Sequence, residues 1–127
     1  MLFVRTELRP SPIHGIGTFL MDPVRKDQLV WRFDPRIDRL YTEAELKDMS
    51  DICKELIDNY GCWDAGKRVW LLYGDEMRYI NHSDDSPLFS TGGPFGDSIA
   101  ARDLAADEEL SVNYRLICDM TRSNGIL

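Results

Sequence analysis

Short apolar runs separated by Gly, Pro and Asp turns follow one another along most of this chain, and this pattern strongly restricts its fold. Runs rich in β-branched and aromatic residues between such turns are typical of short strands. Only one stretch has the spacing of a helix. The sequence therefore predicts a mainly β protein of small sheets with one helical insert. The expected strands are residues 2–4, 18–21, 28–33, 68–73, 98–100 and 109–114.

The helical insert is expected at residues 42–60. Thr42 followed by Glu45 is a capping-box pattern, in which side chains satisfy backbone N–H groups at a helix start. Gly61 is a plausible C-cap, and Ser50-Asp51 could interrupt the helix and start a second one. Apolar residues then predict one buried helix face, made of Leu46, Met49, Cys53, Leu56, Ile57 and Tyr60.

Proline and glycine mark the expected connections. Arg9-Pro10-Ser11-Pro12 predicts a turn after the first strand, because proline lacks a backbone N–H for a strand ladder. Residues 63–66 predict a second turn. Residues 84–96 are rich in Gly, Pro and Ser, so we expect a loop or a broken hairpin there.

Size and cysteine usage indicate a single intracellular domain. At 127 residues the chain is long enough for one domain, residues 1–127, with one modest core. The three cysteines Cys53, Cys62 and Cys118 are widely spread without CxxC spacing, which favours free thiols over a disulfide or a zinc site. We expect no signal peptide and no membrane span. These features predict an intracellular, cytoplasmic protein.

The negative net charge of the chain indicates what kind of partner it binds. The formal net charge is −7, and binding to nucleic acid needs clustered Lys and Arg. We therefore expect no direct nucleic-acid ligand and favour a basic partner, because an acidic surface attracts cationic peptides.

Three blocks of the sequence carry candidate site residues: His14–Phe19, Arg78–Ser83 and Ala101–Tyr114. Gly15 and Gly17 flank Ile16, and glycine permits a positive φ or close approach of a ligand to the backbone. A dinucleotide fingerprint is excluded because Leu20 replaces its third glycine. Each block alone also fits a plain turn or strand end. Other candidates are a metal site at His82, Asp84 and Asp85, and acid–base work by Glu108 and Glu109, for which a solvated turn is the stronger interpretation.

In order, the blocks His14–Phe19, Arg78–Ser83 and Ala101–Tyr114 resemble the SET-domain protein lysine methyltransferases. The resemblance runs from about Phe3 to Tyr114. It implies a SET-type β-clip fold with a C-terminal pseudoknot, a core at about 3–114 and a short tail at 115–127. It also implies methyl transfer from S-adenosylmethionine to a lysine of a basic protein, without a metal.

The resemblance also implies roles for individual residues. Tyr114 would be the catalytic tyrosine that orients the lysine amine. The residues implied in cofactor binding are Gly15, Ile16, Gly17, Asn81 and His82, with Arg78 as a supporting residue.

The chain departs from the family at several positions. Asp107 stands where the family prefers glycine, no aromatic follows Tyr114 closely, and the family's zinc-binding cysteine clusters are missing from this sequence. Two other functions stay open: a SET-like module that only binds a basic peptide, and a methyltransferase for a small amine. A short SET domain of this kind could also complete its site as a homodimer.

Overall fold

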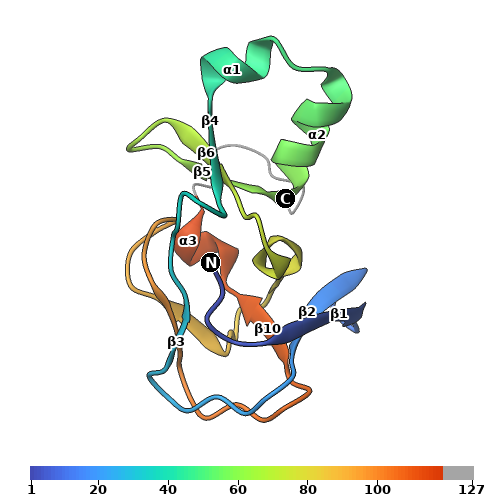
Figure 1. Ribbon diagram of the computed structural model, residues 1–127, viewed down its shortest axis with the longest axis vertical. Coiled ribbons are helices and arrows are strands. Elements are labelled where there is room, and N and C mark those ends of the chain that lie inside the picture. Colours follow the sequence, from blue (N-terminus) through green and yellow to red (C-terminus); the bar gives the residue numbers. More distant parts are fainter. Residues whose placement is uncertain (119–127) are drawn as a thin grey trace.

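Short β-strands dominate the computed structural model, which describes residues 1–118, and they form three small sheets (Figure 1). The strand orders are β1-β2-β10-β7, β3-β9-β8 and β4-β6-β5. The strands are β1 (Thr6–Pro10), β2 (Ile16–Leu20), β3 (Leu29–Trp31), β4 (Arg39–Thr42), β5 (Gly61–Asp64), β6 (Val69–Leu72), β7 (Asn81–His82), β8 (Leu88–Ser90), β9 (Ser98–Ala100) and β10 (Glu109–Val112).

The four-stranded sheet brings together segments that are remote in sequence. β10 pairs antiparallel with β2 along one edge and parallel with β7 along the other, where Ser111 lies opposite Asn81 and Val112 opposite His82. The C-terminal strand is thus inserted between two segments that precede it, as the expected C-terminal pseudoknot requires. This pairing brings the glycine block (Gly15–Gly17), the Asn-His pair (Asn81 and His82) and the start of the C-terminal segment into one region.

The helical insert contains two helices, α1 (Glu43–Lys47) and α2 (Asp51–Tyr60), so the interruption considered at Ser50-Asp51 is present. Thr42 caps α1 as expected, and Ser50 caps α2 by accepting a hydrogen bond from the Cys53 N–H. Because a second helix starts at this cap, the predicted apolar face is divided between two helices. Ile57 is the one residue of α2 that is buried. Within residues 1–118, no helix has the length and apolar character to cross a membrane.

Two shorter helices flank the site region. The 3-10 helix η1 (Glu76–Tyr79) occupies most of the apolar run before Asn81, and α3 (Tyr114–Ile117) starts directly after β10. Asn113 caps α3 by accepting a hydrogen bond from the Arg115 N–H. The expected short tail at 115–127 therefore begins as a helix, and its residues 119–127 lie outside the described part.

Several predicted boundaries are wrong. β1 extends through Arg9 and Pro10, where a turn was expected, because β1 is an edge strand and an edge tolerates a proline without a ladder N–H. The predicted turn at 63–66 begins within β5, and β4 was not predicted at all. β5 and β4 both pair with β6, so tertiary pairing decided their conformation.

The final turn is left-handed although aspartate stands where the family prefers glycine. Asp107 adopts a φ of +71°, the left-handed region that glycine favours. Aspartate is among the residues that tolerate this region. The substitution that sets this chain apart from the family therefore leaves a left-handed turn before β10.

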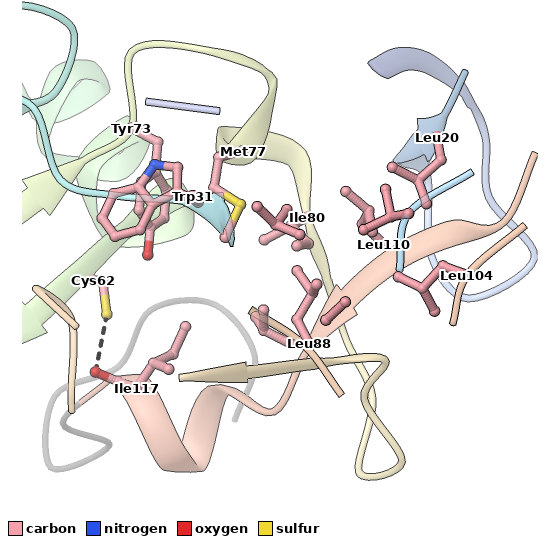
Figure 2. Packing of buried hydrophobic residues seen from close by; sticks show 14 of the residues in the cluster. Leu20, Trp31, Cys62, Tyr73, Met77, Ile80, Leu88, Leu104, Leu110 and Ile117 are labelled. Carbon is pink, nitrogen blue, oxygen red and sulfur yellow. Dashed lines mark hydrogen bonds between the residues drawn. The ribbon is translucent and has the colours of Figure 1, made fainter. Parts of the chain in front are cut away.

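The main core joins strands from different sheets. Figure 2 shows Leu20, Leu104 and Leu110 packed together at one end and Trp31 beside Tyr73 at the other. The Trp31 and Tyr73 rings meet edge to face, with centroids 5.3 Å apart. A second, smaller cluster lies under α2 and consists of Ile57, Trp63, Trp70 and Leu72.

Cys62 and Cys118 form a disulfide, so the prediction of free thiols is wrong for both residues. They are 56 residues apart in sequence, but their Cα atoms lie 5.2 Å apart, within the usual range for a disulfide. No spacing pattern could reveal this pair, because the fold alone brings β5 and the end of α3 together. Cys53 is a free thiol as expected, but it is exposed on α2, where a buried helix face was predicted.

Candidate functional site

A cavity of about 760 Å³ lies between the β1–β2 turn, the end of α2, η1, β7 and α3. Its volume is in the range of small-molecule sites. Aromatic and apolar side chains line it together with the backbone of the glycine block. Six of the seven predicted site residues line this cavity: Gly15, Ile16, Arg78, Asn81, His82 and Tyr114.

The glycine block forms the turn between β1 and β2. Gly15 has a φ of +47°, a conformation that favours glycine. Gly17 is outside the cavity lining, and the space beside it is filled by protein. A Cβ on Gly17 would lie 2.4 Å from Oε2 of Glu109. The close approach expected at Gly17 is thus made by a carboxylate of the chain itself.

Asn81 holds this turn against the rest of the site. Its side-chain amide nitrogen lies 3.0 Å from the His14 carbonyl oxygen and 3.2 Å from that of Ile16. The same nitrogen lies 2.9 Å from Glu109 Oε2 and 3.1 Å from Ser11 Oγ. An amide has only two N–H donors, so these four acceptors already share them. The Asn81 side chain therefore acts by positioning the glycine block.

Glu109, for which a solvated turn was the stronger interpretation, instead lies against the glycine block. Its carboxylate accepts hydrogen bonds from Ser11 Oγ at 2.8 Å and from Asn81, and so joins three segments. The solvated-turn interpretation holds better for Glu108, which pairs with Arg102 on the surface. Two adjacent glutamates in sequence look alike, and only the alternation of β10 turns one of them toward the glycine block.

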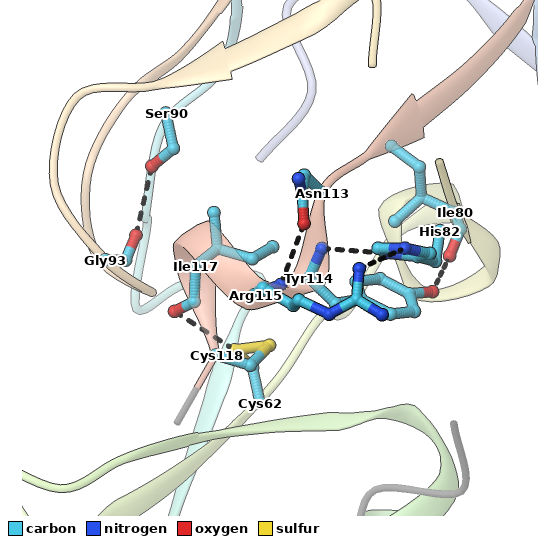
Figure 3. Close-up of a disulfide and its surroundings, with 10 residues drawn as sticks. All are labelled: Cys62, Ile80, His82, Ser90, Gly93, Asn113, Tyr114, Arg115, Ile117 and Cys118. Atoms are coloured by element: carbon cyan, nitrogen blue, oxygen red, sulfur yellow. Dashed lines mark hydrogen bonds between the residues drawn. A yellow bond between two sulfur atoms is a disulfide. The ribbon is translucent and has the colours of Figure 1, made fainter. Parts of the chain in front are cut away.

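His82 links the Asn-His pair to the C-terminal segment (Figure 3). Its Nδ1 accepts a hydrogen bond from the Tyr114 N–H at 3.1 Å. We therefore assign the ring proton to Nε2, which lies 3.0 Å from Asp84 Oδ1. With both ring nitrogens engaged, the His82 side chain orients the start of α3.

The Tyr114 hydroxyl points back into the cavity wall and donates to the Ile80 carbonyl oxygen. Burial raises the pKa of this phenol to about 12, because an apolar environment disfavours the phenolate. At neutral pH the hydroxyl is therefore uncharged and acts as a dipole. Its ring lies 5.4 Å from the His82 ring, measured between centroids.

Alkaline pH is expected to destabilise the protein partly through Tyr114. The folded pKa is about 12 against a reference value of 10.0, so stability is fully present below about pH 10 and falls as pH rises toward about 12. The difference of about two units between these pKa values corresponds to about 2–3 kcal/mol of unfolding free energy. Urea unfolding from pH 8 to 11 should show about half of this loss, since pH 11 lies midway between the two pKa values. Tyr114→Phe should lose less, and an equal loss in both proteins would contradict the assignment.

Other tyrosines of the cavity were missed at the sequence level. Tyr73 is buried beside Trp31, and burial raises the pKa of its phenol as well. Tyr60 and Tyr79 line the opening, with ring centroids 5.6 Å apart. Strand and helix patterns place such residues in an element but do not say which cavity the element borders.

Arg78 supports the cavity wall. Its Nε donates to the Tyr73 carbonyl oxygen at 2.9 Å, which ties η1 to the end of β6. The alternative metal site finds no support in the geometry. Asp84 pairs with Arg115 at 2.6 Å, and residues 1–118 contain no cluster of three potential metal ligands.

Comparison with known proteins finds a matching family model. The family model of the SET domain matches residues 15–115. No curated protein sequence matches the chain. Solved structures do match.

A Plasmodium falciparum protein, described provisionally as a histone methyltransferase, has a TM-score of 0.60 and 17% identity, over 87% of this chain and 93% of that one. Two structures of the Chaetomium thermophilum Polycomb Repressive Complex 2 each have a TM-score of 0.66 and 21% identity, over 93% of this chain and 16% of theirs. One is a humanized mutant bound to the inhibitor GSK126, and the other is an autoinhibited form bound to S-adenosylmethionine.

The TM-scores of these structures establish a shared fold. The mainly β architecture of small sheets is the SET-type fold, as predicted. The chain belongs to the SET domain family. SET methyltransferases use S-adenosylmethionine, which one of the matching structures contains.

Proposed function

We propose that this protein transfers a methyl group from S-adenosylmethionine to a lysine amine of a basic protein. One observation carries the proposal: the glycine block, the Asn-His pair and Tyr114 border one cavity. Membership in a family of methyltransferases supports the reaction class. The neighbour described as a histone methyltransferase supports a basic protein substrate.

The cavity fits the cofactor chemically. It combines polar backbone of residues 14–16 with aromatic walls, the mixture that small-molecule sites use for orientation and burial. Gly15 and Ile16 would contact the cofactor directly, and Asn81 and His82 would hold it through backbone atoms, since their side chains already have partners. When bound, it supplies an electrophilic methyl group on a sulfonium centre.

The protein must present the lysine amine without its proton. A free lysine has a pKa of about 10.4, and an apolar wall lowers that value by disfavouring the charged form. Tyr60, Tyr79 and Ile117 supply such a wall beside Tyr114. The uncharged Tyr114 hydroxyl can then orient the amine by a hydrogen bond and stabilise developing positive charge with its dipole.

The charge of the chain agrees with a cationic substrate. The net charge of −7 favours encounter with a basic protein. Raising the ionic strength should therefore weaken substrate encounter, because salt screens exposed charges.

The decisive experiment is incubation with methyl-labelled S-adenosylmethionine and a panel of basic proteins, followed by mass spectrometry of the products. Label on a protein lysine would support the proposal. Label only on small molecules would favour the small-amine alternative. Absence of cofactor binding by calorimetry would favour a module that only binds a basic peptide.

Replacing Asn81 with alanine is expected to weaken cofactor binding by about 1–3 kcal/mol. The loss follows because the carbonyl oxygens of His14 and Ile16 and the Glu109 carboxylate lose their shared donor. Calorimetry with S-adenosylhomocysteine measures the affinity. Asn59→Ala is a matched control, since Asn59 also lines the cavity. An unchanged affinity of the Asn81 variant would contradict the assigned role.

Two further proposals concern the assembly and location of the protein. We propose that a homodimer completes the site, and a monodisperse monomer with full activity would overturn this. An intracellular, cytoplasmic location also stays a proposal, and fractionation of cells with immunodetection would test it.

A further inference from the structure

The Cys62–Cys118 disulfide is part of the cavity wall. Cys62 lies in β5 and Cys118 directly follows α3, and both residues line the cavity together with Tyr114 (Figure 3). The bond therefore joins the insert sheet to the segment that carries the predicted catalytic residue. No other covalent link connects these two walls within residues 1–118.

The other contacts that hold residues 114–118 in place are weaker than the disulfide. Arg115 and Leu116 are exposed, and Arg115 pairs with the exposed Asp84. Exposed ion pairs contribute little to stability. Ile117 is buried in the core cluster, and Tyr114 keeps its hydrogen bonds to His82 and Ile80. Loss of the disulfide would thus free the end of α3 more than its start.

The two sulfur atoms differ in environment. Cys62 is 1% exposed, whereas Cys118 is partly exposed. Cys62 Sγ lies 3.6 Å from the Ile117 carbonyl oxygen, the contact drawn in Figure 2. A disulfide sulfur carries no proton, so this contact becomes a hydrogen bond only when Cys62 is a thiol. A thiol is only a weak donor, so in the reduced state this contact is a weaker link between β5 and the end of α3 than the disulfide.

We propose that Cys62–Cys118 is a reversible thiol–disulfide site that controls the C-terminal wall of the cavity. In the oxidised form the wall is closed and the cavity binds its ligand. In the reduced form the end of α3 separates from β5 and affinity falls. Disulfides in cytosolic proteins are usually transient, catalytic or redox-sensing, so the predicted intracellular location agrees with reversibility.

The exchange balances with a dithiol as reductant. One thiolate of the dithiol attacks the Cys118 sulfur, the S–S bond breaks, and Cys62 leaves as a thiolate that takes up a proton. The second thiol of the reductant then loses its proton and displaces Cys118 as a thiolate, which is protonated in turn. The reductant becomes a disulfide, and two electrons have passed to the protein. A small disulfide such as oxidised glutathione reverses the reaction.

The test compares the oxidised protein, the same protein reduced by dithiothreitol, and the variants Cys118→Ser and Cys53→Ser. Cys53 is exposed and outside the cavity, so its variant is the matched control. Thiol labelling and mass spectrometry establish the redox state. Hydrogen exchange then follows the amides of Leu116 and Cys118, which donate within α3 to the Asn113 and Tyr114 carbonyls.

Reduction and Cys118→Ser are both expected to speed exchange of these amides about 10-fold or more, since a freed helix end opens locally. Both should lower affinity for S-adenosylhomocysteine about 10-fold, which is about 1.4 kcal/mol, and oxidised glutathione should restore the reduced wild type. Cys53→Ser should match the wild type. Unchanged exchange and affinity after complete reduction would overturn the proposal.

The affinity measurement rests on the proposed function, but hydrogen exchange does not. If S-adenosylhomocysteine binds neither redox form, the proposed function fails, and the exchange rates alone decide the redox proposal. Faster exchange on reduction would still support a redox-controlled wall, and equal exchange would refute it.

Discussion

Tyr114→Phe is expected to lower methyl transfer by on the order of 10²–10³-fold, the effect of removing one preorganised polar group from an active site. The change deletes only the hydroxyl that donates to the Ile80 carbonyl oxygen. The ring and its contact with His82 remain, so cofactor affinity should stay within a few-fold. Single-turnover kinetics with labelled cofactor and calorimetry with S-adenosylhomocysteine separate the two quantities.

Tyr41→Phe is the matched control for this variant. Tyr41 lies on β4, beneath the Arg39 guanidinium and outside the cavity. Removal of its hydroxyl should leave turnover and affinity unchanged. If Tyr114→Phe turned over as fast as Tyr41→Phe, the catalytic role of Tyr114 would be wrong even though the residue lines the cavity.

Gly74→Ala should destabilise the protein by about 3 kcal/mol, at the upper end for overpacking. A Cβ on Gly74 would lie 1.7 Å from the Ile37 carbonyl oxygen. That atom belongs to the backbone, so no rotamer change can relieve the overlap. Gly74 directly follows Tyr73 of the cavity wall, and we therefore expect reduced ligand affinity as well. Urea unfolding measures the free energy.

Gly92→Ala is the control for the same chemical change. No atom lies within 4 Å of a Cβ at this position, so the free energy of unfolding should change by less than about 0.5 kcal/mol. Equal stability of both variants would mean that the approach of Gly74 to Ile37 is relaxed in solution.

The sequence predicted the site better than the boundaries of the elements. Asn81, His82 and Tyr114 were selected because their motifs resemble a family, and all three border one cavity. Their roles stay predictions until the variants are measured. The strands β4 and β5 escaped detection because they are four-residue edges that form only by pairing with β6. Such short segments have little intrinsic preference, and their neighbours decide their conformation.

By itself, the sequence determined the mainly β class, the glycine block with its left-handed Gly15, and the motifs of the family. Local chemistry suffices there, since turn residues and strand patterns act over a few positions. Only the tertiary structure decided that Cys62 meets Cys118 and that Glu109 secures Asn81. These contacts join residues 56 and 28 positions apart, and the packing of the whole chain sets such distances.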